Sequence, residues 1–339
     1  MLDLFTPIAD ENKQHPIFKM MLQEQYQPER DVLTSWANGF EDRDGKFIYE
    51  FQTTFESSMW ELYIHEFLKH LGAEIDFSHH APDFVAELAQ QITIEATIAA
   101  PPHGGEPAAG HGQKYPPQDF SEFNRQSAIR ISNSLSAKIK KLRSSYSKLK
   151  HVEERPHVIA LASFDQPFAH YAANRSIVAV LYGIYFDEEN TIATRSNKFI
   201  KYPVEAVVKN ENVNVPVGLF TTDEYRDVSA VIYSSLATWG KIRAVADNPD
   251  AMTVYNTLHP PLGDSMIPEI RFSKKSEYFE NIADGLHILH NPYAERPLDI
   301  SVFNHERVAQ YFLDPEKGFD IVAPDDFLLL RQLQSFITK

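Results

Sequence analysis

The sequence predicts a mixed α/β fold with a β-hairpin, a basic helix and a buried strand at its centre. The stretch PDFVAELAQQITIEAT (82–97) has two apolar, strand-like arms, which is typical of a hairpin. HVIALASF (157–164) is a continuous apolar run, as expected for a strand buried on both faces. Together they indicate a sheet in which a hairpin precedes a crossover helix, flanked by helices on its faces.

The elements up to the hairpin can be placed from periodicity and turn residues. The pattern of residues 1–50 predicts short helices and loops. TFESSMWELYIHEFLKHL (54–71) predicts a helix that ends at Gly72. Strands are expected at 73–79, 83–88 and 91–98, with a tight turn near Ala89 and Gln90 between the last two.

Beyond the hairpin the pattern alternates between loop, helix and strand. Residues 100–119 are rich in Pro, Gly and Ala, which predicts a mobile loop. Helices are expected at 121–150, 166–183, 274–286 and 325–337, and strands at 215–220 and 228–235. We divide the chain into an N-terminal extension (1–50), a core (51–190) and a C-terminal α+β region (191–339).

Composition narrows the class of protein. The chain has 339 residues and no cysteine, which excludes disulfide frameworks, thiolate zinc sites and cysteine nucleophiles. Its longest apolar run, 177–186, is too short to span a bilayer, and the N-terminus lacks the pattern of a signal peptide. We therefore expect a cytoplasmic protein without a membrane partner.

Charge is distributed unevenly along the chain. The formal net charge is −15, which argues against a nucleic-acid partner. Residues 125–155, however, carry nine Lys and Arg side chains against two Glu. This basic strip either holds a phosphate backbone or is a solvated helix face.

The hairpin brings two carboxylates together. Because alternate residues of a strand share a face, Glu95 and Thr97 point the same way. A tight turn would place Asp83 opposite Ala96 and diagonal to Glu95. Two carboxylates and the Ala96 carbonyl would form a hard oxygen site for Mg²⁺ or Mn²⁺. The alternative is that Asp83 caps a strand end and Glu95 pairs with a lysine.

The helix at 54–71 offers a third acid. At about 100° per residue, Glu56 falls near the centre of its apolar arc, whereas Glu61 lies outside it. Glu56 would then face the interior and could reach a metal at the hairpin. Alternatively, Glu56 lies in the first turn and interacts with the helix dipole.

The order Glu56, Pro82-Asp83, Glu95-Ala96-Thr97, basic helix and buried strand resembles the PD-(D/E)XK superfamily of restriction-endonuclease-like nucleases. The resemblance covers about residues 54–185. It implies a restriction-endonuclease-like mixed sheet core with a C-terminal α+β extension. It also implies that Glu56, Asp83 and Glu95 hold Mg²⁺ (or Mn²⁺), while a lysine two positions after the second acid orients the attacking water.

The sequence departs from this pattern at the lysine, because Thr97 occupies its position. Some members of the superfamily carry the lysine on the following helix. On the helix at 121–150, Lys138 lies beside the apolar stripe, while Lys140 and Lys141 point away. Lys138 is therefore the lysine best placed to reach Glu95; otherwise it lies at the rim of a buried face.

Two functions follow from these residues. The first is a metal-dependent nuclease acting on DNA rather than RNA, in which Arg130, Lys140, Lys141 and Arg143 hold the phosphate backbone. The resemblance also allows a homodimer. The second is an inactive protein of the same fold that serves as a scaffold or as a subunit binding nucleic acid or protein. The acidic trio and the basic strip favour the first function, whereas the missing lysine and the net charge of −15 favour the second.

Overall fold

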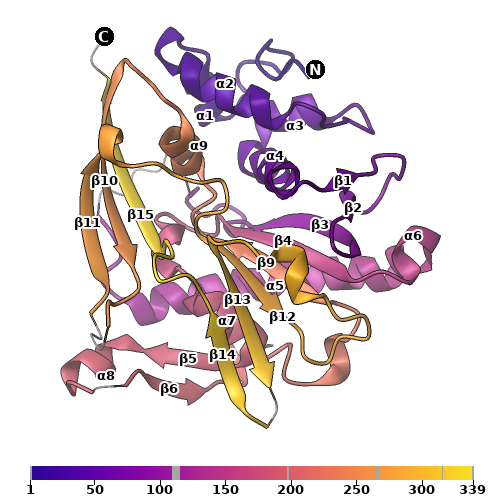
Figure 1. Cartoon of the computed structure of the whole chain (residues 1–339), viewed down its shortest axis with the longest axis vertical. Helices are drawn as coiled ribbons and strands as arrows, with labels where there is room; N and C mark the ends of the chain where they lie inside the picture. Colours follow the sequence, from indigo (N-terminus) through magenta and orange to yellow (C-terminus); the bar gives the residue numbers. More distant parts are fainter. Residues whose placement is uncertain (1, 109–114, 197, 264–266, 315, 338–339) are drawn as a thin grey trace.

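The computed structural model describes residues 2–108, 115–196, 198–263, 267–314 and 316–337. Its centre is an eight-stranded sheet with the order β1-β2-β3-β4-β9-β12-β13-β14 (Figure 1). These strands are β1 (Glu74–Ile75), β2 (Phe84–Glu87), β3 (Gln91–Ala99), β4 (His157–Ser163), β9 (Ala230–Ser234), β12 (Leu286–His290), β13 (Val308–Asp314) and β14 (Gly318–Val322). The predicted mixed α/β sheet is confirmed.

The sheet contains both antiparallel and parallel strand pairs. The first three strands form an antiparallel meander. β3, β4 and β9 are then parallel, β12 is antiparallel to β9, and β13 is parallel to β12. A parallel neighbour requires a crossover, which the helix after β3 supplies.

Helices cover both faces of the sheet. Val158, Ala160 and Ala162 of β4 pack in one apolar core with the N-terminal helices α1 (Pro16–Met21), α2 (Gln27–Trp36), α3 (Phe47–Thr53) and α4 (Phe55–His70). Ile159 and Leu161 point to the other face, onto α5 (Phe120–Ser144) and α7 (Arg175–Tyr182). The alternation explains why β4 is a continuous apolar run.

The remaining strands form smaller sheets. A three-stranded sheet has the order β11-β10-β15, with β10 (Ala251–His259), β11 (Glu269–Lys274) and β15 (Leu330–Ile337). Two ribbons pair β5 (Ile184–Asp187) with β6 (Ile200–Pro203) and β7 (Ala206–Asn210) with β8 (Val213–Pro216). The short helices are α6 (Lys150–Glu153), α8 (Glu188–Ala193) and α9 (Trp239–Val245).

Two predicted helices are wrong. Residues 325–337 contain strand β15, because β10 pairs with it along eight consecutive positions. Residues 274–286 contain one 3₁₀ turn (Lys275–Glu277) and the first residue of β12. In both segments a strand partner distant in sequence outweighs the local helical pattern.

Other boundaries shift by less. The predicted helix at 54–71 is α4, and that at 121–150 ends at Ser144. The helix predicted at 166–183 begins only at Arg175, after a 3₁₀ turn at Ala169–Ala172, and ends at Gly183 with φ of 63°. The strand predicted at 73–79 is limited to β1. Of the predicted loop 100–119, residues 109–114 lie outside the described residues.

The predicted segments 1–50, 51–190 and 191–339 all contribute to this arrangement. Helices from the first segment pack on α4, and strands β9, β12, β13 and β14 from the last segment continue the sheet that begins with β1. Among the described residues, no helix combines the length and the apolar composition that crossing a bilayer requires.

Candidate functional site

Glu95 is the centre of the candidate site. It lies in β3 with 1% of its surface exposed, on the face of the sheet that α5 covers. Its Oε1 accepts hydrogen bonds from Lys138 Nζ at 2.7 Å and Lys141 Nζ at 3.1 Å. The predicted contact between Lys138 and Glu95 is confirmed. The alternative prediction that Glu95 pairs with a lysine is confirmed by the same contact.

The position of Lys141 corrects a prediction. Lys141 was expected to point away from the sheet, but it is three residues after Lys138 and shares its side of the helix. Its Nζ also lies 4.8 Å from the ring centroid of Tyr146. Although partial burial disfavours the charge, the Tyr146 hydroxyl and Glu95 hold the pKa of Lys141 above its ordinary value.

The second oxygen of Glu95 has no hydrogen-bond partner among the described residues. Burial would raise the pKa of Glu95, but the charges and hydrogen bonds of Lys138 and Lys141 hold it below its ordinary value. The carboxylate is therefore ionised at neutral pH. Its Oε2 is buried and makes no hydrogen bond within the described part of the chain. A buried charged acceptor left unpaired is costly, so this atom indicates a missing partner.

Asp83 faces the same end of the hairpin. Its Oδ2 accepts a hydrogen bond from the Ala96 amide at 2.7 Å. Burial, together with the negative charge of Glu95, raises the pKa of Asp83 to about 6, against the opposing effect of Lys138. Because the N–H and C=O of one strand residue point to the same side, the Ala96 carbonyl lies on the edge that Asp83 occupies.

The predicted register of the hairpin is wrong by one residue. Phe84 pairs with Ile94, so three residues, 88–90, form the turn. Continued by one position, this register places Asp83 opposite Glu95 rather than opposite Ala96. The three-residue turn also explains why LAQQ lacks the signals of a two-residue hairpin loop.

Glu56 does not join the hairpin acids. Its Oε1 lies 3.2 Å from His15 Nε2, at the start of α4. The α4 acid that interacts with them is Glu61. Burial and the negative charges of Asp83 and Glu95 raise the pKa of Glu61 to about 8, partly offset by Arg43. The prediction chose the wrong glutamate because α4 is buried around most of its circumference, so an apolar arc could not define its orientation.

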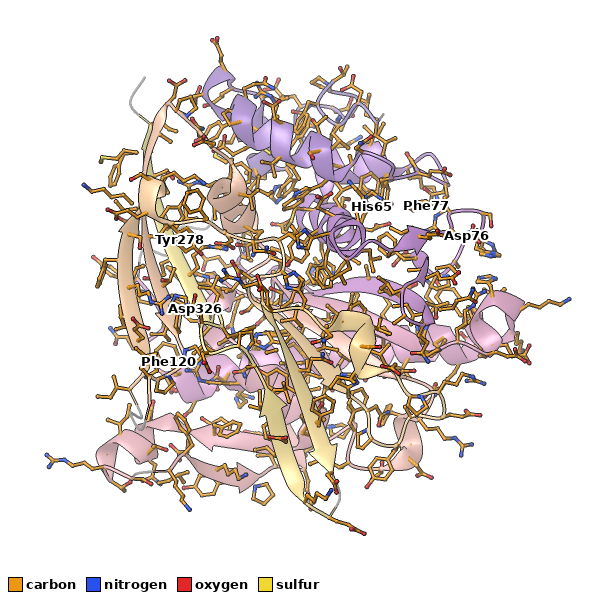
Figure 2. All side chains as sticks on the ribbon, viewed as in Figure 1. His65, Asp76, Phe77, Phe120, Tyr278 and Asp326 are labelled. Atoms are coloured by element: carbon orange, nitrogen blue, oxygen red, sulfur yellow. The ribbon has the colours of Figure 1, made fainter. Side chains whose placement is uncertain are left out.

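Arg43 is a site residue that the sequence did not suggest. Its guanidinium donates to the backbone carbonyls of His79 and Pro82, the latter at 3.0 Å, and lies over Phe77. Phe77 in turn packs on His65 of α4, with ring centroids 5.8 Å apart (Figure 2). Arg43 thus links the loop before α3 to the entrance of β2, next to Asp83 and Glu61. No local pattern marks such a contact.

The remaining predicted residues fall into two groups. Thr97 is half-buried and shares the face of Glu95, Arg130 is half-buried on α5, and Lys140 is exposed. Arg143, by contrast, donates to both carboxylate oxygens of Asp227, at 2.7 and 2.9 Å, and lies over Tyr225. Its guanidinium is occupied by these contacts, which weakens the prediction that it holds phosphate.

The acidic side chains of the site fit a divalent cation in their chemistry but not in their number. No group of three or more His, Asp or Glu side chains in the described ranges is close enough to hold a metal ion. The donor chemistry nevertheless fits Mg²⁺ or Mn²⁺, because Asp83 lies beside Glu95 and one buried Glu95 oxygen lacks a partner within the described ranges. Mg²⁺ is commonly held by one or two carboxylates, with water and substrate phosphate completing its shell.

Comparisons with family models, with curated proteins and with solved structures found no match to this chain. The assignment of a function therefore depends on the residues and geometry of the site.

Proposed function

We propose that the chain is a metal-dependent nuclease of the PD-(D/E)XK type that hydrolyses phosphodiester bonds of DNA. The observation that carries the proposal is the buried Glu95 beside Asp83. One of its oxygens accepts from Lys138, and the other has no partner in the described part of the chain. The order α4, three strands, α5, β4 is the one that the resemblance to this superfamily implies, and it supports the finer assignment of the fold.

Each site residue has a chemical part in this proposal. Asp83 and Glu95 would hold Mg²⁺ or Mn²⁺, with water and a substrate phosphate completing the shell of the ion. When bound, such an ion lowers the pKa of a coordinated water and neutralises charge on a scissile phosphate. Lys138, held at Glu95 by its 2.7 Å contact, supplies the positive charge that Thr97 cannot.

A plasmid-cleavage assay with Mn²⁺ tests this function. Glu95→Gln and Asp83→Asn should lower the cleavage rate by about 100-fold or more, and Lys138→Met by a similar factor, as expected for groups that act on the reacting atoms. Glu56→Gln is the matched control, since Glu56 lies on α4 but contacts His15. Wild-type cleavage that persists in Glu95→Gln would remove this site from the reaction.

The second candidate is a nuclease-fold protein without activity, which binds nucleic acid or a protein partner. It is favoured by the two lysines on one Glu95 oxygen and by the net charge of −15. It predicts that the wild-type protein binds DNA without cleaving it in Mn²⁺, and that Glu95→Gln does not alter this binding. DNA as the partner and a homodimer as the assembly are part of the proposal and await the same assays.

A further inference from the structure

A second pocket lies where β4 and β9 end. It has a volume of about 360 Å³ and is lined by the segment after β4 (Phe168 to Tyr171), the segment after β9 (Thr238 to Arg243) and β15. β4 and β9 are parallel, and crevices at the carboxyl ends of parallel strands are common ligand sites. Glu95 pairs with Ile159 near the start of β4, so the pocket is separate from the carboxylate site.

Arg331 places a buried guanidinium in the wall of this pocket. Only 4% of the residue is exposed. Its Nη1 pairs with Glu280, and its Nη2 donates to the Leu236 carbonyl at 2.8 Å. Its Nε is buried and has no partner within the described residues. A guanidinium N–H in this state is the kind of group that a bound acceptor would satisfy.

Arg243 adds a second positive charge. It makes no hydrogen bond or ion pair within the described ranges, and burial lowers the pKa of its guanidinium. Glu280 already faces two cations, since Lys241 Nζ lies 2.6 Å from its Oε1 and Arg331 contacts the same atom. Glu29 accepts hydrogen bonds from the neutral Asn248 amide at 2.9 and 3.1 Å, and its negative charge partly offsets the effect of burial on the pKa of Arg243. Arg243 and Arg331 are the two cationic residues of the pocket lining.

The pocket lining also contains aromatic side chains. The rings of Phe168 and Tyr171 lie 5.8 Å apart, and Tyr171 also packs on Phe120 of α5 with ring centroids 6.3 Å apart. Phe168 has φ of 60°, a conformation that non-glycine residues adopt rarely and that recurs at ligand sites. A Cβ at Gly240 would approach Arg331 Nη2 to 2.9 Å, so the glycine allows the guanidinium to pack closely against α9.

We propose that this pocket binds a nucleoside phosphate, with the phosphate at Arg243 and Arg331 and the base against Phe168 and Tyr171. Guanidinium groups bind phosphate with paired hydrogen bonds, and aromatic rings stack on bases. A volume of about 360 Å³ lies within the range of small-molecule sites, roughly 300–1,000 Å³. The proposal does not depend on nuclease activity.

Isothermal titration calorimetry of the full chain with AMP and with inorganic phosphate tests the proposal. AMP should bind more tightly than phosphate. Arg243→Gln should weaken AMP binding at least about tenfold, by loss of charge-assisted hydrogen bonds. Gly240→Ala should weaken it by displacing the Arg331 guanidinium, which the added Cβ would crowd. Arg296→Gln, a half-buried arginine outside the pocket, is the control and should leave binding unchanged.

Three results would overturn the proposal. They are no AMP binding to the wild-type protein at millimolar concentration, unchanged binding in both Arg243→Gln and Gly240→Ala, or equal affinity for phosphate and AMP. Glu95→Gln should keep AMP binding even if it loses cleavage, so failure of this site and failure of the nuclease proposal are distinguishable.

The nucleoside phosphate could be a free nucleotide or the end of a nucleic-acid strand. A strand end predicts that a 5′-phosphorylated DNA oligonucleotide displaces AMP while the 5′-hydroxyl form does not. A free nucleotide predicts that neither oligonucleotide displaces AMP. Both results support the pocket and assign the source of its ligand.

Discussion

At the scale of single residues, Glu95 shows how a charge is kept inside a sheet. An isolated carboxylate at 1% exposure would be protonated, because burial disfavours its charged form. Hydrogen bonds from two lysines to one oxygen lower the pKa of Glu95, so the carboxylate stays ionised in the folded protein. Because the pKa of Glu95 is lowered by folding, this ion pair stabilises the protein above the unfolded pKa and is lost as the pH falls through the folded pKa.

Removing one of these lysines should destabilise the folded protein, because the buried charge of Glu95 then has one partner fewer. We expect Lys138→Met to lower the free energy of unfolding at pH 7 by about 1–3 kcal/mol, since Lys141 still pairs with Glu95. Urea denaturation measures the effect. Lys140→Met, an exposed neighbour, should stay within about 0.5 kcal/mol of the wild type. Equal losses in the two variants would contradict this role of Lys138.

Glu61 has the opposite pH dependence. Its folded pKa of about 8 lies above the ordinary value of 4.5, so the folded state holds the proton more tightly and loses stability as the pH rises from about 4.5 through 8. Glu61→Gln should therefore stabilise the metal-free protein at pH 8.5 by about 1–3 kcal/mol and have little effect near pH 4.5. Urea titrations at both pH values measure this difference.

Glu56→Gln is the control for this pH series, since Glu56 is outside the acid cluster. If Glu61→Gln changes the free energy of unfolding equally at the two pH values, the interaction of Glu61 with Asp83 and Glu95 does not cause a pH-dependent loss of stability.

At the scale of elements, the basic side chains of α5 make different kinds of contact. Lys138 and Lys141 point to Glu95, Arg143 pairs with Asp227, and Lys140 is exposed. The helix is therefore not a uniform basic surface. Its remaining capacity to bind a phosphate backbone lies with Lys140 and the half-buried Arg130.

The salt dependence of DNA binding should separate these roles. If Arg130 and Lys140 contact phosphates, Arg130→Gln and Lys140→Gln should each reduce the slope of log K against log salt by about 0.9. Arg143→Gln should leave the slope unchanged and instead lower stability by about 0.5–1 kcal/mol, through loss of the pair with Asp227. Fluorescence anisotropy over a salt series measures the slopes. An unchanged slope in the first two variants would exclude those contacts.

At the scale of the whole molecule, one sheet joins the site to the distant part of the chain. β4, which lies beside the Glu95 strand, is also the neighbour of β9, and β9 connects to β12, β13 and β14. A ligand that binds only the folded site should therefore stabilise the entire cooperative unit.

Metal binding should be visible in this global stability. In Mn²⁺ at about 100 times its dissociation constant, the wild-type protein should gain about 2.7 kcal/mol in the free energy of unfolding. Glu95→Gln and Asp83→Asn should lose this gain, and Glu56→Gln should keep it. Denaturation with and without Mn²⁺ measures it. No gain in the wild-type protein would favour the inactive nuclease-fold alternative.

The parts that could be predicted from the sequence are those with a local pattern. The hairpin arms, the buried strand β4 and the helix α4 were expected close to their observed limits, because strand alternation and apolar runs are properties of neighbouring residues. The contact between Lys138 and Glu95 also followed from position along α5. The function itself stays a prediction.

By itself the sequence determined that Asp83 and Glu95 share one hairpin and that a basic helix follows it, since strand and helix periods are set residue by residue. Only the tertiary structure decided that Glu61 rather than Glu56 faces them, and that Arg43 lies nearby. It likewise made 330–337 a strand. These outcomes depend on how far a buried helix is rotated and on which distant strand offers a partner, and neither is encoded in a local pattern.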